Sequence, residues 1–412
     1  MDTPDMSALA LAGLCALAVS LGIGRFAFTP LLPMMQQDAG LSVTAGGWLA
    51  SANYLGYLMG ALSATALRIR SATAIRAGLA TIVVVTFGMG VAHTFAAWIV
   101  LRALAGLGSA WVLVFTSSWC LERLARTNRP VLNGVVFAGN GTGIALGGAV
   151  CIALMQWRAT SSQAWTALGC LALVGTAAVW GVLATSERVS SADGRHVPAE
   201  ARRWEARRVL LVVCYGVFGF GYIVPATFVP VMARQLVADP LVFGWAWPVF
   251  GIAAALTPLG AAVWARRIGV RRVWAASQAT MALGVAAPIV WPAIGGIMLA
   301  ALLVGGTFMV ITMAAMQQAR AMAGRAATPL MAAMTSAFGA GQIIGPLVAT
   351  SLLGAHAGFS GALLIACVLL LTTAVLLAIP RSERAPCMPY ATAASAAANA
   401  QAGRIDSTIS KR

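Results

Sequence analysis

Two arginines lie within long apolar stretches of the sequence, where a charged side chain needs a partner. Arg25 stands in the stretch from 7 to 35, and Arg102 in the stretch from 95 to 118. An ionised side chain in hydrocarbon costs from about 3 to more than 10 kcal/mol, depending on the method. None of the 11 Asp and Glu residues falls in the middle of such a stretch. The arginines therefore favour an anionic ligand and disfavour a lipophilic cation, which would need a buried carboxylate.

Arg25 has two interpretations. It would lie roughly 27 Å along a helix that begins near Ser7, so its guanidinium could reach the far interface in a purely structural role. Further mostly apolar residues continue to Met35, however, which favours a cavity residue that binds an anionic substrate. Tyr222 occupies the equivalent position in the second half of the chain, where its hydroxyl could donate to the same ligand.

Neutral polar residues in other apolar stretches complete the predicted substrate site. Asn53 and Tyr57 are four residues apart and share one helix face, while Asn140 and Gln342 lie in the stretches 131–155 and 328–353. If protons are coupled to movement of the substrate, the substrate itself carries them, or the interfacial carboxylates Asp38 or Glu122 do.

Catalytic and metal-binding patterns are missing from the sequence. It contains no H-E-x-x-H, G-x-S-x-G or G-x-x-x-x-G-K-[ST] motif, and its seven cysteines lack metal-type spacing. We therefore expect no enzyme activity, no ATP-driven pumping, no metal and no cofactor. A receptor that binds its ligand without moving it remains an alternative, which a flux measurement would separate.

The elements that must position these residues are membrane-spanning helices. The chain of 412 residues is 60% hydrophobic and only 9% charged, and a bilayer needs roughly 20 apolar residues per helix. Twelve stretches satisfy this requirement. They are 7–35, 45–67, 74–92, 95–118, 131–155, 164–184, 208–233, 241–264, 273–291, 294–317, 328–353 and 359–379.

The net charge of +16 is explained by topology. With both termini in the cytoplasm, nearly all of the 27 basic residues fall on the inner side, and the outer loops keep only Arg158 and Arg234. This asymmetry is the positive-inside pattern, and it removes the need for a nucleic-acid partner. We expect a multi-pass protein of a bacterial cytoplasmic (inner) membrane.

The chain divides into two similar halves. A polar segment, 186–207, separates a predicted six-helix bundle at 1–185 from a second at 208–380, and a cytoplasmic tail, 381–412, is predicted to be disordered. Gly22, Gly24, Pro33 and Trp48 are matched 197 positions later by Gly219, Gly221, Pro230 and Trp245. Four matches at one offset indicate a duplication.

Several motifs resemble the major facilitator superfamily (MFS) over residues 5–380. Arg102-Ala-Leu-Ala-Gly106-Leu-Gly108 is similar to the family's R-x-x-x-G-x-G pattern on the fourth helix. Arg266-Arg267-Ile-Gly269-Val-Arg271-Arg272 is similar to its D-R-x-G-R-R loop, with Arg266 in place of Asp. The string Gly22-Ile-Gly24-Arg25-Phe-Ala-Phe-Thr29-Pro30 resembles a bacterial YbfB-like branch.

Glycines in the fifth stretch resemble a motif that the family uses mostly in exchangers and efflux pumps. Gly139, Gly143 and Gly147 repeat every four residues and favour close helix packing, although Ile144 replaces the family's Pro. The Gly-Pro pair stands instead at Gly345-Pro346 in the eleventh stretch. We interpret these glycines as packing residues that also permit helices to rock.

The resemblance implies twelve helices in two pseudo-symmetric six-helix bundles around a central site, hence an all-α membrane protein. It implies a secondary transporter that works as a monomer by alternating access, coupled to protons or a counter-anion. For Arg102 it implies either a coupling role or a structural role through backbone carbonyls of neighbouring helices. We predict transport of a small organic anion, with efflux of neutral drugs or metabolites as the alternative.

Overall fold

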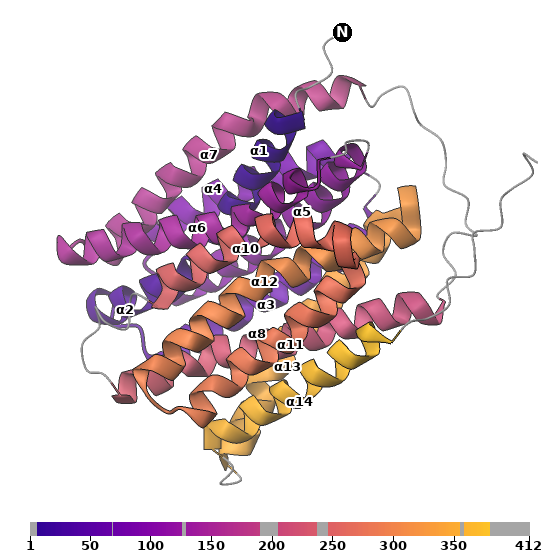
Figure 1. The fold of residues 1–412 in the computed structure, drawn as a ribbon. Coiled ribbons are helices and arrows are strands. Elements are labelled where there is room, and N and C mark those ends of the chain that lie inside the picture. The colour runs from indigo at the N-terminus through magenta and orange to yellow at the C-terminus, as the bar shows by residue number, and fades with distance from the viewer. Residues whose placement is uncertain are drawn as a thin grey trace, which may run out of the picture. The chain divides into compact units, whose positions relative to one another are not determined.

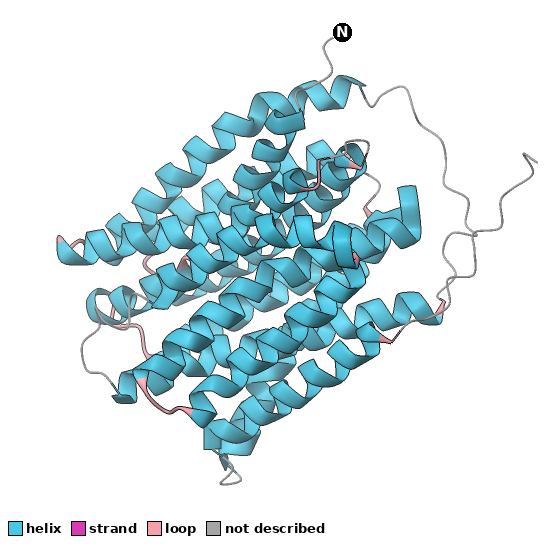
Figure 2. Ribbon diagram, viewed as in Figure 1, coloured by secondary structure: helices cyan, strands magenta, loops and turns pink. Residues whose placement is uncertain are grey.

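The computed structural model describes residues 6–67, 69–125, 129–189, 205–236, 246–354 and 358–379. Most of the predicted linker at 186–207, and the whole predicted tail at 381–412, therefore lie outside the described residues. Within the described ranges every regular element is a helix and no strand occurs (Figure 2). This part of the chain confirms the all-α prediction.

The helices follow the predicted apolar stretches closely. In the half before the linker they are α1 (Met6–Leu17), the π-helix η1 (Ala18–Ile23), α2 (Phe28–Asp38), α3 (Val43–Ala66), α4 (Ser71–Val91), α5 (Phe95–Leu124), α6 (Val131–Gln156) and α7 (Ser161–Val189). After the linker they are α8 (Ala206–Leu236), α10 (Ala246–Ile268), α11 (Val270–Val290), α12 (Ile294–Ala323), the short η4 (Gly324–Ala326), α13 (Ala327–Gly354) and α14 (Gly358–Ala378).

Among the described residues, eleven spans are long and apolar enough to cross a membrane, with Met6–Asp38 counted as one. The predicted stretch that does not qualify, α3, has 24 residues and sufficient length, but it carries Asn53, Tyr54 and Tyr57 in its middle. The polar side chains that lower the mean hydropathy of α3 therefore include two of the predicted substrate residues, Asn53 and Tyr57.

The first span is not the continuous helix that the sequence predicts. The π-helix η1 and a turn at residues 24–27 interrupt it, and Arg25 lies in this turn. Pro30 has no N–H, so the carbonyl oxygen of Phe26 lacks its normal helical donor and accepts from Thr29 N at 3.2 Å instead. The carbonyl oxygen of Arg25, which Thr29 would serve in a regular helix, is thereby left for another partner.

Helices of the two halves pack directly against each other. Helix α6 lies along α10 (Figure 1), and α3 packs along α13. Within the first half, α6 packs on α1 and η1, and α3 packs on α5. Glycines bring α6 and α10 close, because a Cβ on Gly141 would collide with the backbone of Ala254 and Ala255. The division into two bundles at the predicted boundaries stays a prediction, since the linker lies largely outside the described residues.

Candidate functional site

A small cavity of about 10 Å³ lies between helices of the two halves, with room for about one water molecule. The cavity lies about midway along the helices that line it, because Phe308 is near the centre of the 30-residue α12 and Tyr57 near the centre of the 24-residue α3. The first half contributes Leu21, Arg25, Phe26, Tyr57 and Leu113 to its lining, and the second half Tyr215, Phe308, Met309, Thr312 and Phe338.

Arg25 is the one charged residue that lines this cavity within the described chain, and it is 4% exposed. Its Cζ lies 4.0 Å from the ring centroid of Tyr57, 5.5 Å from that of Tyr54 and 5.6 Å from that of Phe26. The guanidinium therefore sits against three aromatic faces, and the described residues provide no carboxylate partner for it.

Gln342 on α13 faces Arg25 across the two halves. The Nη2 of Arg25 donates a hydrogen bond to Oε1 of Gln342, whose side chain is fully buried. This contact leaves two buried donors without a partner, Nη1 of Arg25 and Nε2 of Gln342. Such unpartnered donors on two hydrogen-bonded side chains can serve a ligand that only accepts hydrogen bonds, such as a carboxylate.

Arg102 is buried beside the break in the first span rather than in the cavity. Its Nη1 donates to the carbonyl oxygen of Gly24 at 3.2 Å and its Nη2 to that of Arg25 at 3.3 Å. Its Cζ also lies 4.6 Å from the ring centroid of Phe28. The guanidinium thus donates to the carbonyl oxygen of Arg25, which the break at Pro30 leaves without its helical donor. This contact supports the structural alternative for Arg102.

The other predicted substrate residues lie around the cavity but not all in its wall. Tyr57 lines it, whereas Tyr222 packs behind it and stacks on Phe308 at a centroid distance of 4.4 Å. Asn53 donates from Nδ2 to the carbonyl oxygen of Arg102 at 3.0 Å, so it ties α3 to α5. Asn140 contacts Sδ of the lining residue Met309 at 3.0 Å.

Neither of the two predicted coupling carboxylates, Asp38 and Glu122, lines the cavity. Glu122 forms an ion pair with Arg320 at 3.8 Å, which joins the ends of α5 and α12 in different halves. Nearby, the hydroxyls of Ser118 and Thr328 lie 2.6 Å apart. Asp38 accepts hydrogen bonds from the backbone N and, at 2.8 Å, from Oγ of Ser161 at the start of α7.

The predicted glycines have different environments. A Cβ on Gly139 or Gly143 would collide with the backbone of the first span, so these two positions bring α6 close to α1 and η1. Gly147 does not continue this contact, because the nearest atom to its Cβ would be Cδ2 of Leu168 at 4.0 Å. Gly345 packs against Ile223 of α8, and Pro346, which has no N–H, leaves the carbonyl oxygen of Gln342 without its helical donor.

The sequence interpretation missed the aromatic walls. Phe26, Phe308, Phe338 and Tyr215 line the cavity, and none of them stood among the predicted site residues. A signal existed in the second half, since Tyr215, Phe218 and Tyr222 recur at helical spacing and share one face of α8. Of these three residues, only Tyr222 was among the predicted site residues.

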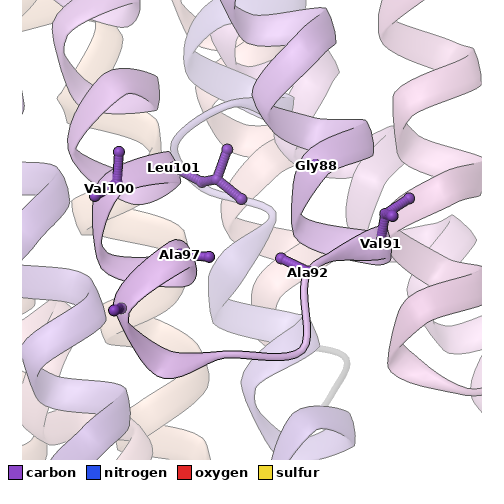
Figure 3. Close-up of a pocket in the computed structure, with 7 residues that line it drawn as sticks. Gly88, Val91, Ala92, Ala97, Val100 and Leu101 are labelled. Carbon is purple, nitrogen blue, oxygen red and sulfur yellow. The ribbon is translucent and has the colours of Figure 1, made fainter.

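A larger hollow of about 560 Å³ lies between α4 and α5 (Figure 3). It is lined only by apolar residues, among them Gly88, Val91, Ala97 and Leu101, next to the connection between the two helices. It provides no group that could orient a polar ligand. The small cavity at Arg25 is therefore the candidate site, despite its size.

Comparison with known proteins gives a family match over most of the chain. The family model described as "Uncharacterised MFS-type transporter YbfB" matches residues 17–378. A curated relative from Bacillus subtilis (strain 168), the uncharacterised MFS-type transporter YceJ, is 37% identical over 94 residues. That alignment covers 22% of this chain and 24% of the relative, so the match spans about a quarter of that protein's length.

Proposed function

The chain belongs to the YbfB-like family of MFS-type transporters, and we propose that it moves a small organic anion across the membrane by alternating access. The family makes it a multi-pass membrane transporter with a small-molecule substrate. The anionic substrate, the mechanism and the role of Arg25 are the parts that we add.

The observation that carries the proposal is the buried, unneutralised guanidinium of Arg25 beside Gln342. Burial of an ion costs several kcal/mol in a protein, even after relaxation. A cation–π contact returns about 2 kcal/mol when desolvated, and the ring of Tyr57 at 4.0 Å is the closest one here. The ring contacts and the hydrogen bond to Gln342 lower this cost, but Nη1 keeps no hydrogen-bond partner and no described carboxylate faces the guanidinium; a bound anion would supply both.

Contacts between the halves on both sides of the cavity support alternating access. Towards one end of α12, Arg320 lies eight residues beyond Thr312, about 12 Å along the helix, and pairs with Glu122. Towards the other side, the ring centroid of Phe26 lies 6.2 Å from that of Trp247, near the start of α10. A substrate would reach Arg25 when one of these sets of contacts opens and leave when the other does.

The test uses the purified full-length protein in detergent, screened for thermal stabilisation by small carboxylates. A ligand that binds the folded state raises its melting temperature by mass action. We expect carboxylates to stabilise the wild type and to have no effect on Arg25→Gln.

A second variant, Gln342→Glu, tests the same site from the other side, because it places a carboxylate of nearly the same shape next to Arg25. This internal anion would raise the melting temperature of the ligand-free protein and abolish the response to added carboxylates. Stabilisation by carboxylates that is equal in the wild type and both variants would overturn the proposal.

A further inference from the structure

The charge pattern of the cavity limits the number of negative charges that a ligand can carry. Arg25 is the one charged side chain in the described lining. The guanidinium of Arg102, the other intramembrane cation, already donates to the carbonyl oxygens of Gly24 and Arg25. One anionic group would be neutralised here, and a second would meet only the uncharged hydroxyls of Tyr57, Tyr215 and Thr312 and the aromatic rings, with no positive charge to balance it.

Aromatic rings from both halves form much of the cavity wall. Phe26 of the first half meets Phe308 of the second edge to face, with centroids 5.8 Å apart. Tyr57 of the first half meets Phe338 of the second in the same way, at 6.2 Å. Both pairs bridge the interface between the halves, so a substrate ring can enter between the walls only where such a pair separates.

Further rings support these two pairs in the second half. Phe308 stacks on Tyr222 at 4.4 Å, and Phe338 lies 5.4 Å from Tyr215. Since these supporting contacts lie within one half, Phe308 and Phe338 can keep their orientation while the bridging pairs separate. A flat ring then fits when the walls part by about one ring thickness, roughly 3.5 Å. A bulkier saturated ring needs more.

We infer that the substrate is a planar aromatic monocarboxylate, whose carboxylate binds Arg25 and Gln342 while its ring lies between Phe26, Phe308 and Phe338. This inference rests on the proposed function and adds the class of anion to it. The polar groups at the cavity provide donors for one carboxylate, and the ring edges and faces provide the contacts that aromatic groups prefer.

The experiment measures equilibrium binding to the purified full-length protein with four probes: benzoate, cyclohexanecarboxylate, terephthalate and acetate. We expect benzoate to bind at least tenfold more tightly than each of the other three. Tenfold corresponds to about 1.4 kcal/mol. Cyclohexanecarboxylate has the same charge and a similar size but no flat ring, and terephthalate adds a second carboxylate to the same ring.

A pair of matched variants tests the ring contact itself. Phe308→Leu should weaken benzoate roughly tenfold and cyclohexanecarboxylate less than twofold. Phe250→Leu is the control, because Phe250 is buried in the same aromatic cluster, 6.0 Å from Phe308, but does not line the cavity. It should leave the preference for benzoate unchanged.

The outcomes separate this inference from the proposed function. If no probe binds the wild type, or if binding persists unchanged in Arg25→Gln, the proposed function fails. If binding depends on Arg25 but cyclohexanecarboxylate or terephthalate binds as tightly as benzoate, the aromatic monocarboxylate is overturned while the anion site stands. Equal losses of benzoate in Phe308→Leu and Phe250→Leu would also overturn it.

Discussion

Substitution of Gly141 by alanine should weaken the contact between the two halves, whereas the same change at Gly147 should not. A Cβ on Gly141 would collide with the backbone of Ala254 and Ala255 and lie 2.7 Å from the carbonyl oxygen of Gly251. On Gly147 it would meet only Cδ2 of Leu168, at an ordinary 4.0 Å. Both changes gain the same helix propensity, so the difference between them isolates the contact with α10.

The expected loss of stability follows from the helices that must move apart. Backbone atoms cannot rotate away as side-chain ends do, so α6 and α10 must separate by roughly 1 Å to restore van der Waals distances. Overpacking of this kind costs about 1–3 kcal/mol. For a compact unit of the size of Met1–Ala378, with an unfolding entropy of about 2 cal/mol/K per residue, that lowers the melting temperature by roughly 1–4 °C.

The assay is thermal unfolding in detergent, combined with hydrogen exchange of the α6 and α10 amides. Gly141→Ala should melt earlier than the wild type and exchange faster in both helices, since the cost falls on the conformation in which the two halves touch. Gly147→Ala should match the wild type in both measurements. Equal melting temperatures for the two variants would refute the packing argument.

Two further predictions concern the polar contacts. Arg102→Gln should destabilise the protein by roughly 2–4 kcal/mol, because two charged hydrogen bonds are lost. In a Pro30→Ala background the loss should be roughly 1–2 kcal/mol smaller, because the regular helical hydrogen bonds can form again. Thermal unfolding of the two single variants and the double variant measures this difference, and additive effects would contradict the prediction. Glu122→Gln should change stability by less than about 1 kcal/mol, because the Glu122 side chain is 40% exposed and its pair with Arg320 is screened. Melting at low and high salt checks the second prediction, and a large effect that survives high salt would count against it.

The sequence predicted the helices and the buried cation well because both depend on local composition. Long apolar stretches define spans in any context, and Arg25 was identified by its cost in hydrocarbon. Gln342 was predicted from its polarity alone, and its contact with Arg25, 317 residues away in sequence, required the packing of α13 against the first half.

Other features depended on tertiary contacts that no local pattern contains. Pro30 was visible, but its consequence, a break that Arg102 completes, follows only when α5 is placed beside the first span. Asn53 and Tyr57 share a helix face in the sequence pattern, yet Asn53 binds the backbone of α5 while Tyr57 lines the cavity. The aromatic walls were missed because Phe and Tyr are common packing residues in membrane helices.

The most direct test of the central claim, that Arg25 and Gln342 form the anion site of a transporter, is flux in proteoliposomes. Vesicles containing the full-length protein and loaded with an unlabelled small carboxylate are mixed with the same labelled carboxylate outside. We predict exchange by the wild type and at least tenfold slower exchange by Arg25→Gln and by Gln342→Glu. Each variant is reconstituted at the same amount of protein per vesicle, and its melting curve is used to check that it is folded. Exchange by Gln342→Glu at the wild-type rate would contradict the account.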